Sequence, residues 1–506
     1  MTATVRSFGL KGLTPFDVQV EVDASAGLPA FGIVGLPDAA IQESKERVRA
    51  AMRNIGAQFP MKRIVVNLSP ADEPKYGPIY DLPILMGLLQ ASKQLSVNLS
   101  GVAFIGELSL TGEILPVHGV LPMVRRAAKQ GLRAVVLPEG NLGEVRYIKD
   151  IEIYAVRDVP ALLAHLTGEA PLSPVTPAEF SPEVHAFSVD FSEVMGQAVA
   201  RRALEIAAAG GHNLLMLGPP GSGKSMLARR FPTILPALTF DEAVECTELY
   251  SVAGRLEQDA LMDARPFRAP HHTASITALC GGTGRLTPGE ISLAHNGVLF
   301  LDEFPEFPPK LLEALRQPLE DNEITVSRAA GSVTYPANLT LIAAMNPCPC
   351  GYLGHPNKPC TCSPAAIRRY VRRISGPILD RIDMHIEVPA VEYTHLSATA
   401  RAESSADIRA RVERAREIQR DRYKDEAFTK NADLTASALK RWCVPDAESD
   451  ALLKAQFDAT ALSARGYTRV LKVARTIADL AGEEDLTLSH IMEALQYRSL
   501  SKNYYL

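Results

Sequence analysis

The sequence has 506 residues, which predicts about two to four domains. Hydrophobic residues make up 46% and charged residues 22%, a composition typical of an ordinary soluble globular protein. The sequence has no apolar stretch of about eighteen residues and no N-terminal signal segment, so we expect a cytoplasmic protein with no membrane association. A formal net charge of −5 excludes a globally basic nucleic-acid coat, although a local basic channel is compatible with it.

Residues 1–166 predict an α+β domain. Alternating strand-like segments with Gly/Pro turns open this region, and further strands are expected between its helices. We expect those helices at about residues 38–55, 81–92 and 121–130.

A domain boundary is expected at residues 167–187. This linker is rich in Pro, Ser, Thr and Glu and has no apolar periodicity. Residues 188–390 then alternate apolar strands with helices, which predicts a parallel sheet and an α/β fold. Residues 398–506 are rich in Ala, Leu and Arg at helical spacing and predict a helical lid.

Residues 218–225 read GPPGSGKS and match the phosphate-binding loop G-x-x-x-x-G-K-[ST] between an apolar strand and a helix. The glycines allow successive backbone N–H groups to point into one concavity that holds phosphate oxygens. We expect Lys224 to reach the β- and γ-phosphates of ATP and the Ser225 hydroxyl to bind Mg²⁺. The residues predicted to hold the nucleotide are Gly218, Pro219, Pro220, Gly221, Ser222, Gly223, Lys224 and Ser225.

A second nucleotide motif is GVLFLDEF at residues 297–304. Its four apolar residues, 298–301, predict a short buried strand, and Asp302 and Glu303 follow at the end where open α/β sheets bind ligands. Asp302 is expected to hold Mg²⁺ through water, and Glu303 to orient or deprotonate the attacking water. The alternative, two solvated carboxylates that cap the next helix, is disfavoured because the phosphate loop lies about 80 residues upstream.

The sequence holds seven cysteines, four of them in the segment 346–364. This segment is an insertion rich in Pro and Gly with no core of its own, and such a loop needs a cross-link. A tetrahedral structural Zn²⁺ is favoured over free thiols, although the C-x-C spacing is tighter than the usual C-x₂-C. The predicted ligands are Cys348, Cys350, Cys360 and Cys362, with His355 as a substitute, and Cys246, Cys280 and Cys443 are expected to be buried small hydrophobes.

The order of these parts resembles that of the AAA+ ATPases. The segments FPTILPAL, RPFRAPHHTASITALCGG and LTPGEISLAHNGVLFLDEF are similar to the magnesium-chelatase-related branch of that family. Within this branch the match to the bacterial competence proteins covers nearly the entire chain. The resemblance therefore implies an AAA+ core with a helical lid.

The resemblance also implies roles for polar residues outside the two motifs. Asn346, at the end of LTLIAAMNP, would be the sensor-1 residue that positions the hydrolytic water. Arg381, in PILDRID, matches the arginine finger that reaches the γ-phosphate of a neighbouring subunit, so a ring, expected to be a hexamer, is implied. Arg469 would be sensor 2, with Arg465 and Arg475 as alternatives in the same segment.

The resemblance to this family also implies that two inserted elements lie on the pore side of the ring. They are the segment 265–286 and the hairpin 323–336, and their cationic side chains could face a phosphodiester backbone without reading its sequence. The candidate DNA contacts are Arg268, His271, His272, Arg285 and Arg328. It is equally open that the two histidines instead cap a helix or donate hydrogen bonds to buried carbonyl groups. A further basic cluster, Arg368, Arg369, Arg372 and Arg373, would suit a subunit interface as well as DNA.

The segment from Gly106 to Glu139 resembles the proteolytic domain of Lon, which has a ribosomal-S5-domain-2-like fold. That family uses a Ser–Lys dyad, but Ile79 stands in the place of the serine and Leu121 in the place of the lysine. An isoleucine can neither attack a carbonyl nor be activated by a base, so we expect no protease. The same fold without the dyad occurs in RadA-like branch-migration proteins, which favours a scaffold and DNA-channel role.

These features together predict an ATP-dependent, ring-shaped DNA motor, a helicase that drives branch migration of recombination intermediates during natural transformation. Its expected partners are single-stranded and branched DNA, with recombination proteins as possible further partners. The alternative is a chelatase-type or protein-remodelling AAA+ ATPase that acts on a partner protein. A third reading is an ATP-gated scaffold in which hydrolysis only times the release of a partner.

Overall fold

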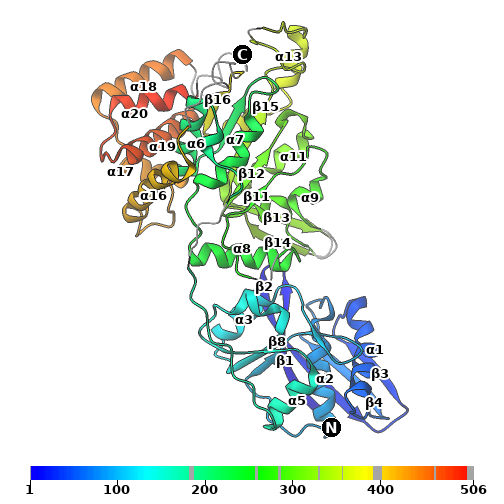
Figure 1. The fold of residues 1–506 in the computed structure, drawn as a ribbon. Coiled ribbons are helices and arrows are strands. Elements are labelled where there is room, and N and C mark those ends of the chain that lie inside the picture. Colours follow the sequence, from blue (N-terminus) through cyan, green and yellow to red (C-terminus); the bar gives the residue numbers. More distant parts are fainter. Residues whose placement is uncertain are drawn as a thin grey trace.

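The structure is a computed structural model of the 506-residue chain. It describes residues 2–181, 187–256, 260–282, 286–328, 331–355, 357–390, 402–460 and 463–498. Figure 1 shows an elongated molecule in which an N-terminal unit lies below a second unit, with the C-terminal helices on one flank of the latter. Within the described ranges, no helix has the length and apolarity that crossing a membrane requires.

The N-terminal unit is built on one seven-stranded sheet in the order β3-β4-β2-β1-β5-β8-β9. Its strands are β1 (Thr2–Lys11), β2 (Thr14–Ser25), β3 (Ala30–Val34), β4 (Arg63–Ser69), β5 (Val102–Phe104), β8 (Ala134–Pro138) and β9 (Glu152–Val156), with a small hairpin of β6 (Glu107–Leu108) and β7 (Ile114–Leu115). Its helices are α1 (Ala39–Asn54), α2 (Asp81–Ala91), α3 (Val120–Lys129), α4 (Leu142–Val145) and α5 (Val159–Thr167). Alternate residues of β2 enter the core, among them Val18, Val20 and Val22, because side chains of a strand point to opposite faces in turn.

The second unit contains a five-stranded parallel sheet in the order β11-β12-β15-β10-β16. The strands are β10 (Leu214–Leu217), β11 (Phe267–Arg268), β12 (Val298–Leu301), β15 (Thr340–Met345) and β16 (Met384–Glu387). Leu214 and Met216 enter the core on one face of the sheet, and Leu215 and Leu217 enter the core on the other. Burial on both faces explains why these strands are continuous apolar runs.

Helices and one hairpin complete this second unit. They are α6 (Ala198–Gly210), α7 (Lys224–Arg230), α8 (Phe240–Val252), α9 (Ile276–Cys280), α10 (Glu290–Leu293), α11 (Pro309–Ala314), α12 (Pro318–Asp321), α13 (Pro364–Val371) and α14 (Gly376–Leu379), with the hairpin β13 (Glu323–Arg328) and β14 (Gly331–Pro336). The C-terminal helices are α16 (Ser405–Arg422), α17 (Ala436–Trp442), α18 (Ala447–Thr460), α19 (Ala464–Ala481) and α20 (Leu488–Gln496). Helix α19 contacts α6, α16 and α20 and so ties this helical group to the parallel sheet.

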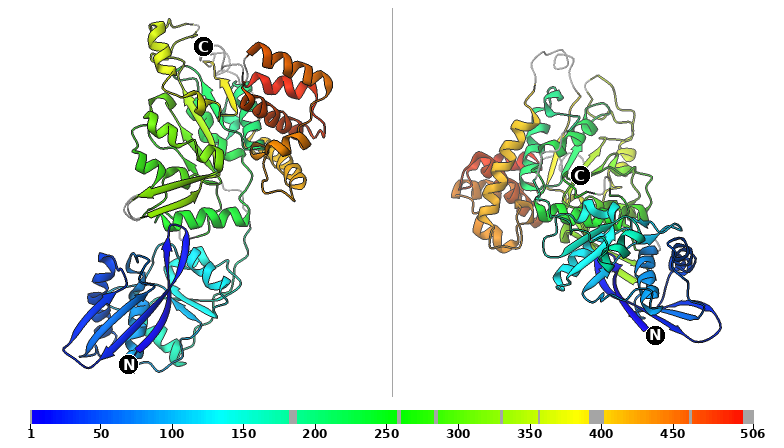
Figure 2. Two further views of the ribbon diagram at one scale, coloured as in Figure 1. Left: turned by 180° about the vertical axis from the view of Figure 1, so that it is seen from behind. Right: turned by 60° about the horizontal axis from the view of Figure 1, so that its bottom comes forward.

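Helix α8 joins the two units, and Figure 2 shows it between them from behind. Val244 and Cys246 of α8 belong to the core of the N-terminal unit, whereas Leu249 belongs to a core of the second unit. The Ser251 hydroxyl donates to buried Glu144 (2.6 Å), which lies in α4. The two sheets are therefore connected through a helix with residues in both cores.

The expectation of a mixed α/β fold with a parallel sheet is confirmed. Helices expected at 38–55, 81–92 and 121–130 correspond to α1, α2 and α3, with ends that differ by at most one residue. The carboxylate of Asp38 accepts the N–H of Ile41 (2.9 Å) and sets the start of α1, which is why the sequence located this boundary well.

Candidate nucleotide site

The phosphate loop lies between β10 and α7 and has a backbone that favours glycine. Gly221 and Gly223 have φ angles of 78° and 93°, in the left-handed region. A Cβ on Gly218 would lie 2.2 Å from the carbonyl oxygen of Val388. The predicted loop therefore has the glycine-dependent turn that a concave row of backbone N–H groups requires.

Lys224 lies folded onto its own loop. Its ammonium donates to the carbonyl oxygens of Gly218 (2.7 Å) and Pro219 (2.9 Å) and to Asn346 Oδ1 (3.3 Å). Burial lowers the pKa of Lys224, against the opposing effect of Asp302. The side chain is thus held at the loop and contacts the expected sensor-1 residue directly.

The two residues predicted to bind magnesium contact each other. The Ser225 hydroxyl donates to Asp302 Oδ2 at 2.5 Å. Ser225 follows β10 through the phosphate loop, Asp302 follows β12, and Asn346 follows β15. Because these strands are parallel, their carboxyl ends bring all three side chains to one edge of the sheet. Hydroxyl and carboxylate oxygens are ligands that suit Mg²⁺.

Glu303 directly follows this group and has an unusual backbone. Its φ of 52° is in the left-handed region, which non-glycine residues seldom adopt. Its carboxylate pairs with His272 Nδ1 at 3.0 Å, while 55% of the side chain is exposed. The His271 ring packs at a tilt against that of His272, with ring centroids 4.1 Å apart. His272 therefore contacts the candidate general base and His271 contacts His272, a role the sequence did not suggest because His272 and Glu303 lie 31 positions apart.

Arg381 and Arg465 share one acidic partner. Arg381 is buried, pairs with Glu320 and also donates to the carbonyl oxygen of Pro377 (2.8 Å). The other carboxylate oxygen of Glu320 accepts from Arg465 (2.9 Å). Arg381 precedes β16, whose start lies at the sheet edge opposite the phosphate loop. The expected arginine finger is therefore turned toward Glu320 in the single chain.

Arg469 and Arg475 have partners of a different kind. Arg469 pairs with the fully buried Asp383, which also precedes β16. Burial acts to raise the pKa of Asp383, but Arg469, His212 and the N–H of Asn213 together hold it well below its usual range. Arg475 is buried and donates to Asp479 (3.1 Å) within α19. The structure thus places the expected sensor-2 residue in a structural ion pair between α19 and the sheet.

Some of the candidate DNA-contacting residues form hydrogen bonds within the chain. Arg268 makes two hydrogen bonds to Glu290 (2.6 and 2.8 Å), which raise its pKa. Arg328 donates to the carbonyl oxygen of Gly282 (3.0 Å), so the hairpin contacts the inserted segment. Arg285 lies outside the described residues. The basic cluster of residues 368–373 lies on and just after α13 with its arginines exposed, and Arg373 pairs with Glu306 (2.5 Å).

The four clustered cysteines converge on one point. Their sulfur atoms all lie within 4.8 Å of one another, and the Cys348–Cys350 separation is 3.4 Å. The N–H groups of Tyr352 and Thr361 lower the pKa of the Cys350 thiol to about 5, whereas burial raises that of Cys348. His355 instead accepts from the N–H of Asn357 (3.1 Å). The described thiols form a set that could hold a tetrahedral metal ion.

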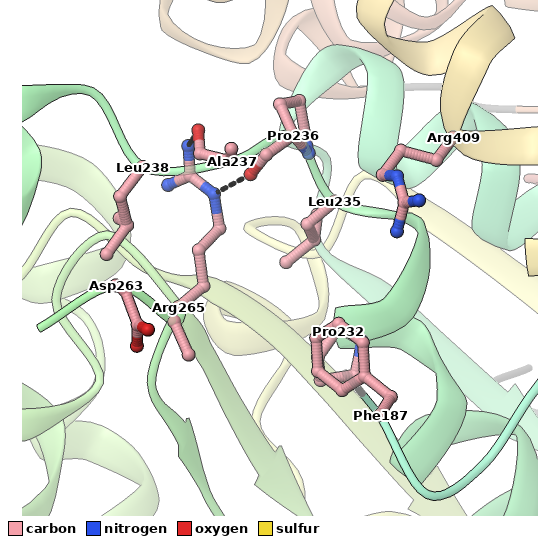
Figure 3. Close-up of a pocket in the computed structure, with 10 residues that line it drawn as sticks. Phe187, Pro232, Leu235, Pro236, Ala237, Leu238, Asp263, Arg265 and Arg409 are labelled. Carbon is pink, nitrogen blue, oxygen red and sulfur yellow. Dashed lines mark hydrogen bonds between the residues drawn. The ribbon is translucent and has the colours of Figure 1, made fainter. Parts of the chain in front are cut away.

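A small pocket near the linker is a separate feature (Figure 3). Phe187, Arg265 and Arg409 line it, and Arg265 Nε donates to the carbonyl oxygen of Pro236 (2.6 Å). Its volume is about 20 Å³, room for a water molecule and far too little for a nucleotide.

Comparison with known proteins agrees with this geometry. Residues 190–396 match the family model of magnesium chelatase, subunit ChlI, residues 20–141 match a second model of that subunit, and residues 402–498 match its C-terminal model. The competence protein ComM of Haemophilus influenzae is 44% identical over 490 residues, which cover 96% of this chain and 94% of that protein. The chain belongs to the ComM/YifB family of magnesium-chelatase-like AAA+ proteins.

Other members of the ComM/YifB family and one more distant group are also similar. The protein YifB of Escherichia coli is 42% identical over 494 residues, with 97% of this chain and 96% of that protein covered. Lon protease 2 of Bacillus subtilis is 29% identical over 129 residues, only 25% of this chain. The predicted family is thus confirmed, and the Lon resemblance is limited to part of the chain.

Proposed function

We propose that this protein is an ATP-driven DNA motor that assembles as a ring. The observation that carries this proposal is the meeting of Lys224, Ser225, Asp302, Glu303 and Asn346 at one edge of a parallel sheet. A phosphate loop, a carboxylate pair and a polar strand tip at one edge form the set that phosphoryl transfer to water needs.

Each residue has a defined part in hydrolysis. Lys224 leaves the carbonyl oxygens of its loop and stabilises charge on the terminal phosphates. Ser225 and Asp302 would hold Mg²⁺, which would neutralise further phosphate charge. Glu303 orients the attacking water and accepts its proton, and Asn346 positions that water. His272 Nδ1 contacts one carboxylate oxygen of Glu303, and the carboxylate has a second oxygen that can accept from this water.

Ring assembly completes the site through arginines of the adjacent subunit. Arg381 acts in trans on the γ-phosphate, and its pairing with Glu320 accounts for its inward position in the single chain. Arg465 shares Glu320 with Arg381, so we propose that Arg465 acts with it, and that Arg469 holds α19 to the sheet instead.

Two arguments support DNA as the track. The relative from Haemophilus influenzae is named a competence protein, so we place this chain in the same process, in which branch migration would join incoming DNA to the chromosome. The N-terminal unit has buried Ile79 and Leu121 in the places of the Lon dyad, which suits a scaffold beside DNA rather than a protease.

We also propose that Cys348, Cys350, Cys360 and Cys362 hold a structural Zn²⁺. Four convergent sulfur atoms in a loop rich in Pro and Gly support this assignment.

ATP turnover with and without DNA tests the proposed function. Turnover should rise when single-stranded or branched DNA is added, and Lys224→Ala should remove it. Turnover that no DNA stimulates would instead favour a chelatase-type or protein-remodelling role on a partner protein.

A further inference from the structure

The cysteine cluster lies directly against the nucleotide site. Asn346 immediately precedes Pro347 and Cys348, and its side chain accepts from Lys224 Nζ at 3.3 Å. Cys348 is fully buried. A metal ligand is thus two residues from the side chain that contacts the phosphate-loop lysine.

A second contact joins the same insertion to the phosphate loop. Gly351 has a φ of 83°, and a Cβ built on it would lie 2.6 Å from Pro220 Cδ and 3.9 Å from Asn346 Cγ. The backbone at Gly351 therefore rests on the ring of Pro220. Because Pro220 is part of the phosphate loop, the insertion contacts both the loop and the residue beyond β15.

The insertion has little of its own to hold this shape. Of its residues that the structure describes, only Pro347, Cys348 and Gly351 are buried. Its internal backbone hydrogen bonds include Gly351 N–H to Cys348 O (2.9 Å) and His355 N–H to Tyr352 O (3.1 Å). So few buried groups cannot fix a loop of this length, which leaves the four sulfur atoms as its cross-link.

We propose that Zn²⁺ bound by the four cysteines organises the nucleotide site, so that affinity for ATP depends on zinc. The thiols bind as thiolates and release their protons, and the closed cluster then holds Gly351 against Pro220 and Asn346 beside Lys224. This inference rests on the proposed nucleotide site and adds a metal dependence to it. It does not depend on DNA as the track.

Two glycine variants of the full-length protein distinguish zinc binding from the contact between Gly351 and Pro220. Gly351→Ala adds a methyl group against Pro220, whereas Gly354→Ala adds one at a similar φ of 76° with nothing within 4 Å. Both variants should keep one zinc per chain, and because both place an alanine at a similar positive φ, each should lower the melting temperature only modestly. Gly351→Ala should weaken binding of a fluorescent ATP analogue by about tenfold or more, the effect of losing one charge-assisted hydrogen bond. Gly354→Ala should bind the analogue like the wild type.

Metal removal gives an independent measurement. Chelator-treated, reduced protein should bind the analogue at least about tenfold more weakly, and added Zn²⁺ should restore binding. Equal affinity of the zinc-loaded and zinc-free proteins would overturn the inference, as would Gly351→Ala binding like Gly354→Ala.

Lys224→Ala distinguishes this failure from failure of the nucleotide site itself. If Lys224→Ala loses binding of the ATP analogue while Gly351→Ala and the zinc-free protein keep it, the zinc dependence alone is overturned. If Lys224→Ala binds the analogue as tightly as the wild type does, both the proposed function and this inference are overturned.

Discussion

At the residue scale, the site contains residues of two kinds: those that a motif names and those that only folding brings near. Lys224, Asp302 and Glu303 belong to local patterns whose chemistry can be read from a few neighbours. His272 and Glu320 carry no such pattern, and their importance follows from contacts to Glu303 and Arg381 across long sequence separations. Sequence reasoning thus named the candidate reacting groups but did not predict which side chains contact them.

Glu303→Gln is the direct test of the candidate base. An amide keeps the size of the side chain but cannot accept a proton, so ATP turnover should fall by about 10²- to 10⁴-fold. Nucleotide affinity should stay close to that of the wild type, because Lys224 and Ser225 are unchanged. Steady-state turnover and binding of a fluorescent nucleotide measure the two effects. A variant that hydrolyses ATP within about twofold of the wild-type rate would assign the base to another residue.

At the scale of elements, the predicted helices and strands were located well because caps and apolar runs are local features. The sequence of α8 did not indicate that this helix has residues in two cores. That role depends on where the two units lie, which no local pattern encodes. Arg469 shows the same limit. Its place in an arginine-rich helix is compatible with sensor 2, yet the structure pairs it with Asp383 at the base of β16.

Replacement of Arg469 should therefore destabilise the fold. Arg469→Met leaves the carboxylate of Asp383 buried with a principal partner lost, so the free energy of unfolding of this unit should fall by about 3 kcal/mol. Arg465→Met is a matched control on α19, because Arg465 is exposed and its ion pair should contribute less than about 1 kcal/mol. Urea unfolding measures both. Equal losses in the two variants would contradict the structural role of Arg469.

The stability contributed by Asp383 also has a defined pH dependence. The folded-state pKa of Asp383 lies below its ordinary value. Its contribution is therefore present above the unfolded-state pKa, about 3.9, and is lost as pH falls through the folded-state pKa. The difference in unfolding free energy between wild type and Arg469→Met should thus be the same at about pH 6 and about pH 8. A difference that disappears within this window would show that another group supplies the effect.

At the scale of the whole molecule, the chain couples a nucleotide site to an N-terminal unit through α8. Ser251 near the end of α8 donates to Glu144, and Glu248 of α8 pairs with Arg125 (2.7 Å), so α8 contacts α4 and α3 of the N-terminal unit through polar groups as well as through its buried side chains. The sequence predicted the family and a domain boundary at residues 167–187, but the contact of α8 with both cores is visible only in the folded structure.

Assembly should govern hydrolysis. Arg381→Ala should leave nucleotide binding intact and lower the turnover of the assembled protein by about 10³-fold, because the charge on the γ-phosphate loses its trans partner. Two measurements check this effect: ATP turnover as a function of protein concentration, and the size of the assembly at each concentration. Unchanged turnover in an intact ring would assign the finger to another arginine.

The most direct test of the DNA-motor account is ATP-driven branch migration of a labelled, movable three- or four-way DNA junction. The account predicts strand separation by the wild-type protein that requires ATP and is absent with Lys224→Ala. Junctions that stay intact, in a preparation that hydrolyses ATP without stimulation by DNA, would contradict it.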